Sequence, residues 1–334
     1  MHEFATGRVV RTDAKVCHVE IGDKVLLCAP RGKLFEGLEQ KNPIAVGDLV
    51  QVDLEGNPCS IEGVLPRRNW LGRTASSHDP REQVLVANVD RLFVIGSLGK
   101  PGFSSNRTDR ILAACAWHGI PAALVINKVD LAREGDLDAL RASYAGANVE
   151  WHETCALDRR GVDRLAERLR GAVNVFYGAS GAGKSSLINA IQPGLKLKVG
   201  KISKFWDAGK HTTAHSQLIP LAQGGWVIDT PGIRTFRLHR LSVGELRGLF
   251  PEIVRFQDRC KFPDCSHDHE PDCAVFDAVE QEELPATRYG SYLEMLDELR
   301  NSTGGEDVPD AEEAPGSESG GDSGRASGRA SDLD

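Results

Sequence analysis

The sequence predicts an α/β protein with a mostly parallel sheet, preceded by a small all-β barrel and followed by a short helical region. Three features carry this prediction. Short β-like runs punctuated by turn residues extend as far as Pro66. Strands alternate with helical segments from Asp90 to Asp229, and three of the eight cysteines crowd into residues 260–273.

The composition is that of a folded globular chain with one acidic extension. The chain has 334 residues, 40% hydrophobic and 26% charged, which allows two or three domains of ~150 residues. Its formal net charge is −8, but residues 301–334 hold nine acids and two arginines, so the remainder is close to neutral. Basic patches on a neutral body remain compatible with an anionic partner. We expect residues 301–334 to form a disordered acidic tail.

The lack of a recognisable targeting signal and the small number of cysteines favour a reducing compartment. The first residues lack the apolar core of a signal peptide, and no run of 18 apolar residues occurs, so we expect a cytoplasmic protein with no membrane partner. Eight cysteines are too sparse for a disulfide scaffold, and a local Cys/His cluster therefore favours metal binding. Cys17, Cys28, Cys59, Cys115 and Cys155 are scattered along the chain and are expected to act as small hydrophobic side chains.

Residues 1–68 read as five short strands with no helical period. Gly22-Asp23 and Gly47-Asp48 supply turns. The pattern fits a closed barrel of the OB type, which often binds oligonucleotides, but it leaves any other small β-barrel open because a fold does not dictate a function. A locally basic connection follows from Arg67 to Arg110. The predicted strands lie near residues 9–10, 16–21, 24–29, 49–54 and 61–65.

Residues 69–240 have the alternation of a βαβ domain, and residues 241–300 read as short helices around the Cys/His cluster. A lysine-rich segment from Lys196 to Lys210 interrupts the alternation. A last helix is predicted over residues 289–300. In the βαβ domain, strands are predicted over 91–98, 121–127, 148–153, 173–177 and 226–229, and helices over 106–117, 136–144, 161–169 and after Gly183.

A phosphate-binding loop lies between a predicted strand and a predicted helix. Residues 178–186 read GASGAGKSS and match GxxxxGK[ST] in the strand-loop-helix context that this motif requires. Its backbone N–H groups and the following helix N-terminus would hold phosphates, with Lys184 on the terminal phosphates and Ser185 on Mg²⁺. The nucleotide-binding residues predicted here are Gly178, Ala179, Ser180, Gly181, Ala182, Gly183, Lys184, Ser185 and Ser186.

A second motif selects the base. Residues 127–130 read NKVD at the end of the apolar strand PAALVI, the edge of a parallel sheet where ligands bind. The Asp130 carboxylate can accept hydrogen bonds from the guanine N1–H and exocyclic amine, which adenine does not present. Asn127 and Lys128 would brace the neighbouring loop and cover the ring. A phosphate-binding loop alone would also fit a kinase that uses ATP, and NKVD argues against that alternative.

A third motif, DTPG at residues 229–232, ends the strand that begins at Trp226. Asp229 would hold the Mg²⁺ shell, and the Gly232 N–H would contact the γ-phosphate. Between this motif and the phosphate-binding loop, HTT at residues 211–213 offers a switch threonine that would close over Mg²⁺. Thr213 is slightly preferred to Thr212.

The order of these motifs is reversed with respect to conventional GTPases, because NKVD precedes the phosphate-binding loop. In this respect the sequence resembles the circularly permuted GTPases and, among them, the ribosome small-subunit-dependent GTPase A family (RsgA, YjeQ-like). The resemblance covers residues 5–300. It implies an N-terminal OB-fold, a permuted GTPase core and a C-terminal zinc domain. Further matching words are VLPRRNWLGR at 64–73, ANVDRLFVI at 87–95, GKHTT at 209–213 and CKFPDCSHDHEPDC at 260–273.

The last of these words contains a candidate metal site. Three thiolates and one imidazole would form a closed tetrahedral Zn²⁺ site with no open position for catalysis, so we expect a structural role. His269 competes with His267 as the fourth ligand, and the family pattern favours His267. The predicted ligands are Cys260, Cys265, His267 and Cys273.

Two positions depart from conventional GTPases. Thr154-Cys155-Ala156 stands where a Ser-Ala word usually closes the guanine site, and the Ala156 N–H would still meet guanine O6. Ile233 follows DTPG, where Ras-like enzymes place the Gln that orients the attacking water, so intrinsic hydrolysis is expected to be slow. We hypothesise that Gln223, or a group supplied by the ribosome, positions that water.

The family resemblance implies a Mg²⁺-dependent GTP hydrolase acting in late maturation of the small (30S) ribosomal subunit, binding rRNA and stimulated by the subunit. Lys184, Gln223 and Thr213 are its expected catalytic residues, Ser185, Thr213 and Asp229 its Mg²⁺ ligands, and a monomer its expected state. The alternative is an RNA-binding protein gated by GTP or GDP, in which hydrolysis is incidental. The complete Lys184, Ser185 and Asp229 set argues against this alternative, and the apolar Ile233 argues mildly for it.

Overall fold

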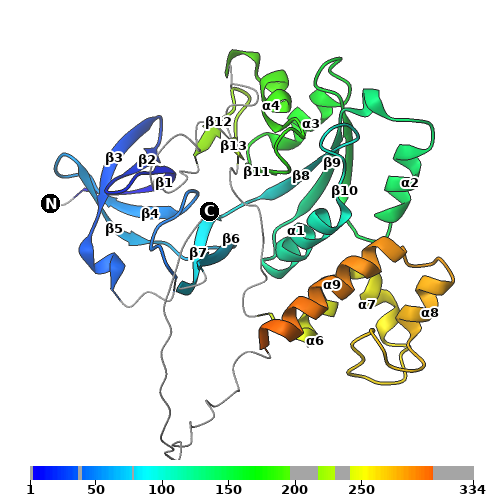
Figure 1. Ribbon diagram of the computed structural model, residues 1–334. Helices are drawn as coiled ribbons and strands as arrows, with labels where there is room; N and C mark the ends of the chain where they lie inside the picture. Colours follow the sequence, from blue (N-terminus) through cyan, green and yellow to red (C-terminus); the bar gives the residue numbers. More distant parts are fainter. Residues whose placement is uncertain (1–2, 37–39, 77–78, 196–216, 230–240, 304–334) are drawn as a thin grey trace, which may run out of the picture.

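The computed structural model describes residues 3–36, 40–76, 79–195, 217–229 and 241–303 (Figure 1). The N-terminal region forms the predicted closed barrel, in the strand order β1-β2-β3-β5-β4. Its interior is filled by alternate, fully buried side chains such as Val9, Val19 and Ile61. The strands are β1 (Phe4–Thr12), β2 (Cys17–Ile21), β3 (Lys24–Pro30), β4 (Leu49–Asp53) and β5 (Cys59–Val64), and a 3₁₀ turn, η1 (Gly32–Phe35), follows β3.

The basic connection after the barrel contains a β-hairpin that the sequence analysis missed. Strands β6 (Trp70–Ser76) and β7 (Asp79–Ala87) form a two-stranded antiparallel sheet. Polar residues dominate the distal half of both strands, so an apolar alternation appears only where Leu71, Val84 and Val86 are buried. The sequence analysis described this region only as a locally basic connection and assigned no strands to it.

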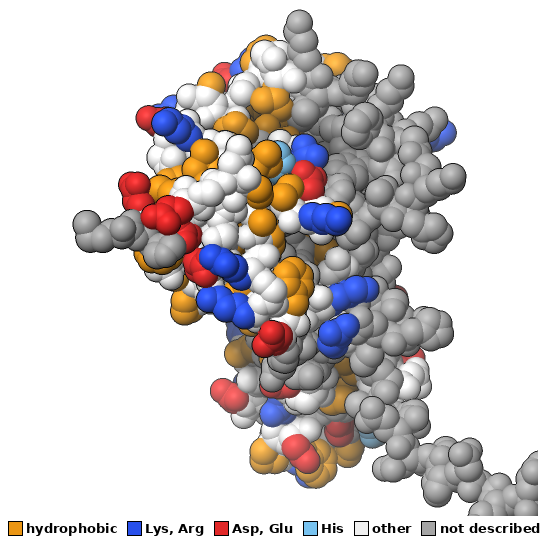
Figure 2. All heavy atoms as spheres, turned by 90° about the vertical axis from the view of Figure 1, so that its left-hand side faces the viewer, with side chains coloured by type: hydrophobic (Ala, Val, Ile, Leu, Met, Phe, Trp, Pro, Cys, Tyr) orange, Lys and Arg blue, Asp and Glu red, His pale blue; other side chains and the backbone are white. Residues whose placement is uncertain are grey.

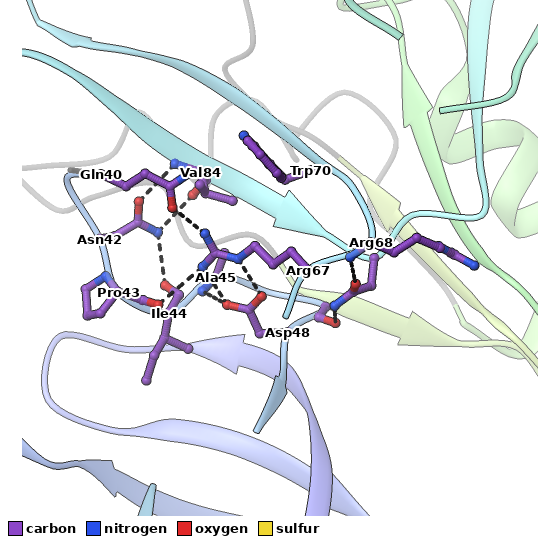
Figure 3. Close-up of polar contacts among 12 residues, drawn as sticks. Gln40, Asn42, Pro43, Ile44, Ala45, Asp48, Arg67, Arg68, Trp70 and Val84 are labelled. Atoms are coloured by element: carbon purple, nitrogen blue, oxygen red, sulfur yellow. Dashed lines mark hydrogen bonds and ion pairs between the residues drawn. The ribbon is translucent and has the colours of Figure 1, made fainter. Parts of the chain in front are cut away.

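A buried ion pair joins the barrel to this hairpin. Nε and Nη2 of Arg67 each donate to a different carboxylate oxygen of Asp48 at 2.8 Å, and Asp48 is fully buried. The same carboxylate accepts the backbone N–H of Ala45 at 2.8 Å, while the Asn42 side chain exchanges two hydrogen bonds of 2.9 Å with the Val84 backbone (Figure 3). A bidentate pair of this kind fixes orientation as well as distance.

The central domain is a six-stranded sheet in the order β10-β9-β8-β11-β13-β12, parallel except for β12. Side chains of β8 alternate between two cores: Leu92 and Val94 pack with α1 on one face, and Phe93 and Ile95 pack with α3 and α4 on the other. Burial on both faces explains why the strand is apolar throughout. The elements are β8 (Arg91–Ser97), α1 (Ser105–Trp117), β9 (Ala122–Asn127), η2 (Val129–Leu131), α2 (Asp136–Ser143), β10 (Glu150–Thr154), α3 (Val162–Leu169), β11 (Val173–Tyr177), α4 (Lys184–Ile191), η3 (Pro193–Leu195), β12 (Leu218–Pro220) and β13 (Trp226–Asp229).

The C-terminal region is helical and packs against α1 (Figure 1). Arg110 on α1 makes a bidentate pair with Glu298 on α9, at 2.6 and 2.7 Å. Among the helices that the structure describes, none is long and apolar enough to cross a membrane. The helices of this region are α6 (Val243–Arg247), α7 (Pro251–Gln257), α8 (Ala274–Glu280) and α9 (Ala286–Thr303).

A buried cluster of charged groups lies at the centre of this contact. The Arg288 guanidinium on α9 pairs with Asp109 on α1, at 2.6 Å, and with Glu252 on α7. It is sandwiched between the Tyr144 and Phe250 rings, 5.4 and 4.8 Å from their centroids. Burial raises the pKa of Asp109, although Arg288 opposes the shift. One cation thus holds two carboxylates from different elements inside the protein.

Replacing that cation should destabilise the whole contact. Arg288→Leu removes the cation that two buried carboxylates share, although the Tyr144 hydroxyl still donates to Asp109. We expect the free energy of unfolding to fall by about 3–5 kcal/mol in urea titrations. Because a carboxyl with a raised pKa in the fold favours its protonated form, the loss should shrink as the pH is lowered. Asp163→Ala, which removes an exposed pair with Arg159, should cost under about 1 kcal/mol. An equal decrease in the free energy of unfolding in Arg288→Leu and Asp163→Ala would contradict the stabilising role of Arg288.

Candidate functional site

The NKVD segment and the phosphate-binding loop meet at the carboxyl edge of the sheet. β9 ends at Asn127, and β11, two strands away, runs directly into the loop. The Asn127 side chain, 1% exposed, donates from Nδ2 to the Ala182 carbonyl at 2.9 Å. Its Oδ1 accepts the Thr154 hydroxyl at 3.3 Å from the end of β10. Asn127 therefore ties the ends of three strands together.

Lys128, the next residue, also connects the loop after β9 to the phosphate-binding loop. It adopts a left-handed backbone conformation, with φ of 62°, which turns the chain sharply after β9. Its Nζ donates to the Gly181 carbonyl and to the Lys100 carbonyl, both at 2.7 Å. The bracing predicted for Asn127 and Lys128 is thus present in the structure.

The phosphate-binding loop is packed so tightly that it requires glycine at two positions. A Cβ on Gly183, whose φ is 101°, would lie 2.1 Å from Asn127 Nδ2. A Cβ on Gly178 would lie 2.3 Å from the Ile95 carbonyl. The Lys184 ammonium at the start of α4 donates to the carbonyls of Gly178 and Ala179, at 2.8 and 3.2 Å. A charged Lys curled over backbone N–H groups at a helix start is suited to a polyphosphate.

The base side of the site is formed by η2 and by the turn after β10. Asp130 is exposed, Cys155 is buried and Ala156 is half-buried. Burial raises the pKa of the Cys155 thiol, and the facing Asp130 carboxylate raises it as well. The buried Cys155 thus stays a neutral thiol beside Asp130, at the position where conventional GTPases place a serine.

Several predicted residues lie outside the described residues. Thr213 and its neighbour Thr212 fall there, as do Gly232, Ile233 and the lysine-rich segment. The backbone of Asp229 is described: it ends β13 and pairs with Phe176 of β11, one residue before that strand ends. This register brings Asp229 to the same edge of the sheet as the phosphate-binding loop.

Gln223 is not at the site, and the hypothesis that it positions water was wrong. The turn from Leu221 to Gly225 precedes β13, so it lies at the opposite, amino edge of the parallel strands. The Gln223 Nε2 donates to the Ala166 carbonyl of α3 at 2.8 Å, and the next residue, Gly224, accepts from Gly171 just before β11. The five residues of β11, ~3.3 Å each, separate this turn from the phosphate-binding loop.

The loop after β8 also belongs to the site, although the sequence analysis did not single it out. A small open pocket lies between the phosphate-binding loop and this loop, and Phe103, Arg107 and Thr108 line it opposite Gly178 and Ala179. The available signal was position alone, because β8 is a parallel strand whose end lies at the same edge as Asn127.

The C-terminal cysteines and one histidine form a compact cluster. Cys260 Sγ lies 3.5 Å from His267 Nδ1 and 4.0 Å from Cys273 Sγ, and all four donor atoms, Cys265 included, are within 4.8 Å of one another. Ligands of a tetrahedral zinc ion, at about 2.0–2.3 Å from the metal, would show separations of this size. The donor set and its spacing therefore fit a metal ion.

Local contacts select His267 over His269. The His267 backbone takes a φ of 60°, and its carbonyl accepts the Tyr289 hydroxyl at 2.6 Å. The Tyr292 hydroxyl donates at 2.7 Å to the carbonyl of Ser266, the residue before His267. Helix α9 therefore holds the backbone of the turn that carries His267. The His269 side chain is 73% exposed and turns toward Asp268. Of the two candidates, only His267 faces the thiols.

Comparison with known proteins agrees with this geometry. The family described as RsgA GTPase matches residues 64–239. The chain belongs to this family. It is 36% identical to the small ribosomal subunit biogenesis GTPase RsgA of Bacteroides fragilis, over 87% of this chain and 96% of that protein. The corresponding protein of Flavobacterium johnsoniae is 34% identical, over 81% and 86% of the two chains.

Solved structures show the same architecture. The crystal structure of YjeQ from Thermotoga maritima covers 89% of this chain, with a TM-score of 0.72 and 34% identity, and 99% of that chain is matched. YloQ, described as a circularly permuted GTPase, covers 90% of this chain, with a TM-score of 0.68 and 28% identity, and 96% of it is matched. The fold is thus a circularly permuted GTPase with an N-terminal barrel, and the chain is a GTP hydrolase, as the motif order predicts.

Asn127→Ala tests the junction between the two loops. It leaves the Ala182 carbonyl without the hydrogen bond from Asn127 and removes one of the two acceptors of the Thr154 hydroxyl, which costs about 1–3 kcal/mol. We expect GDP and GTP binding to weaken by about 5- to 150-fold in calorimetric titrations. Gln223→Ala, at the far edge of the sheet, serves as the control and should keep both affinity and turnover. Reduced turnover in the control would restore Gln223 as a catalytic candidate.

Cysteine and histidine variants test the metal cluster. Cys265→Ser should lose bound metal, measured by elemental analysis of the purified protein, together with helical circular dichroism from the C-terminal region. His269→Ala should keep both. Full metal content in Cys265→Ser, or metal loss in His269→Ala, would contradict the ligand set.

Proposed function

We propose that this GTPase times its own binding to, and release from, the small ribosomal subunit during late assembly of that subunit. The observation that carries the proposal is the NKVD loop hydrogen-bonded onto the phosphate-binding loop, at 2.9 Å from Asn127 and 2.7 Å from Lys128. It occurs in a chain that matches small ribosomal subunit biogenesis GTPases along most of their length. We assign the barrel to residues 1–68, the GTPase domain to 69–240 and the metal-binding domain to 241–300.

Guanine recognition is assigned to the loops after β9 and β10. The Asp130 carboxylate accepts from the base N1–H and exocyclic amine, and the Ala156 N–H donates to O6. The exposed carboxylate and the half-buried Ala156 support this assignment, since both face solvent where a base could stack. Lys184 leaves the carbonyls of Gly178 and Ala179 to reach the terminal phosphates. The phosphates are held by the backbone N–H groups of Gly178, Ala179, Ser180, Gly181, Ala182, Gly183, Ser185 and Ser186.

Magnesium would be held by Ser185, Thr213 and Asp229. When bound, the ion neutralises charge that develops on the β- and γ-phosphate oxygens. The Gly232 N–H contacts the γ-phosphate. The ends of β11 and β13 lie next to one another, which supports a shared site for Ser185 and Asp229.

The attacking water is positioned by the ribosomal subunit. Ile233 follows DTPG and cannot orient water, and Gln223 lies at the other edge of the sheet. A site that lacks its own orienting group turns over slowly until a partner completes it. Stimulation by the subunit then follows from the apolar Ile233 at the position where other GTPases carry a water-orienting Gln.

The metal in the Cys260, Cys265, His267 and Cys273 cluster is assigned as structural Zn²⁺. All four protein ligands are present, and no open position remains for catalysis. We assign rRNA as the partner of the barrel; Lys and Arg side chains, the groups that would contact phosphates, lie on the barrel-side face together with Asp, Glu and hydrophobic side chains (Figure 2). We assign a cytoplasmic monomer, in keeping with a ribosomal partner.

Helix α1 offers a route from the nucleotide to the C-terminal domain. Thr108 lines the cavity beside the phosphate-binding loop, and the next residue, Asp109, binds Arg288 of α9. A shift of α1 on loss of the γ-phosphate would therefore act directly on the metal-binding domain.

GTP turnover with and without purified small ribosomal subunits tests the proposal, with Lys184→Ala as the inactive reference. We expect at least about ten-fold stimulation by small subunits, which corresponds to 1.4 kcal/mol of barrier, and none by large subunits. Nucleotide binding without stimulation, together with subunit affinity that still differs between GTP-analogue and GDP states, would instead support an RNA-binding protein gated by nucleotide.

A further inference from the structure

Three cysteines that are distant in the sequence lie side by side in the barrel. Cys17 on β2 pairs with Cys28 on β3, and Cys28 pairs with Cys59 on β5. Directly paired residues point to the same side of a sheet, so the three thiols form one row across three strands. Cys28 is fully buried, Cys17 is 3% exposed and Cys59 is half-buried. Cysteines that are scattered along the sequence are thus neighbours in the barrel, where Cys17 and Cys28 also belong to the hydrophobic core as expected.

Within this row, Cys28 and Cys59 are placed for a covalent bond. Neighbouring strands are about 4.8 Å apart, a spacing within the range of about 4.4–6.8 Å that a disulfide needs between its Cα atoms. Burial raises the pKa of Cys28 to about 11, and the nearby Cys59 thiol contributes to that shift. Cys59 Sγ lies 3.7 Å from the Leu54 carbonyl and 3.9 Å from the Gly56 carbonyl, in the turn before β5. Cys59 is therefore the thiol that a reagent in solvent meets first.

We propose that Cys28 and Cys59 form a peroxide-responsive disulfide that closes the β3–β5 seam of the barrel. Among the described barrel strands, this seam is the parallel pairing, and its register joins Cys28 with Cys59, Ala29 with Ser60, and Pro30 with Ile61. A covalent link at its first pair would add to these pairings.

The reaction balances with hydrogen peroxide as the oxidant. The Cys59 thiolate attacks one peroxide oxygen, the O–O bond breaks, and the departing hydroxide takes a proton and leaves as water, giving a sulfenic acid. Cys28 sulfur then attacks Cys59 sulfur, the S–O bond breaks, and the Cys28 proton leaves with the hydroxide as a second water. Two thiols lose two electrons, and one peroxide is reduced to two waters.

The link would stiffen the basic segment that follows the seam. Arg31 donates from its backbone to the Ile61 carbonyl at 3.2 Å and from Nε to Glu62 at 2.6 Å, across the same two strands. Lys33 reaches the same carboxylate at 3.4 Å. Oxidation of the neighbouring cysteines thus fixes where η1, with its exposed Phe35, sits on the barrel surface.

Non-reducing peptide mapping of the full, metal-loaded chain after hydrogen peroxide treatment tests the proposal. We expect a Cys28–Cys59 peptide, lighter by about 2 Da than the two separate peptides and released by dithiothreitol. Cys17→Ser is the matched control and should keep the cross-link, whereas Cys59→Ser should abolish it. In the Cys17→Ser background, oxidation should also raise the urea midpoint of the barrel. These readouts do not involve GTP, so they stand or fall independently of the proposed function.

Two outcomes would overturn the proposal. One is that Cys28 and Cys59 can still be alkylated as free thiols after a peroxide dose that has already oxidised the metal cluster. Release of the metal, measured with a chromogenic chelator, shows that this dose has been reached. The other is a cross-link that joins Cys17 to Cys28 and survives Cys59→Ser. Because Cys59 is half-buried, Cys59→Ser is expected to fold, and its unchanged urea midpoint under reducing conditions is the check.

Discussion

The hydrogen bond from Asn127 to the Ala182 carbonyl is the contact on which the functional site depends. It joins two loops separated by more than fifty residues, and it exists because β8 alone lies between β9 and β11 in the sheet. Parallel strands put all their carboxyl ends at one edge, so the loops need no long excursion to meet. Two further hydrogen bonds reinforce the contact. Thr154 at the end of β10 donates to Asn127, and Lys128 donates to the Gly181 carbonyl. Gly183 is needed at the contact because Asn127 leaves no room for a side chain.

A permuted chain order leaves this geometry intact because the sheet order, not the sequence order, sets which loops are neighbours. The permuted chain order does change which domains are joined to the two ends of the GTPase core. The barrel precedes it and is held by the Arg67–Asp48 pair, while the metal-binding helices follow it and are held by Arg288. Both attachments use a buried, well-paired arginine. Such pairs contribute more to a fixed orientation than to net stability, because burying the charges has its own cost.

The metal cluster and the Arg288 cluster act on the same helix. Tyr289 and Tyr292 of α9 support the turn that presents His267, and Arg288 of α9 reaches into α1. The turn that presents His267 and the contact with α1 are therefore both supported by α9.

The sequence by itself determined the motifs, most strand and helix positions and the presence of a Cys/His cluster, because each of these depends on local pattern or spacing; the preference for His267 over His269 came from the family resemblance. β11 and β13 begin and end where the apolar runs do. Only the tertiary structure decided three matters: that Gln223 lies at the wrong edge, that residues 70–87 form a hairpin, and that Cys17, Cys28 and Cys59 are neighbours. Each depends on strand pairing and direction, which bring together residues far apart in the chain and leave no signal in local sequence.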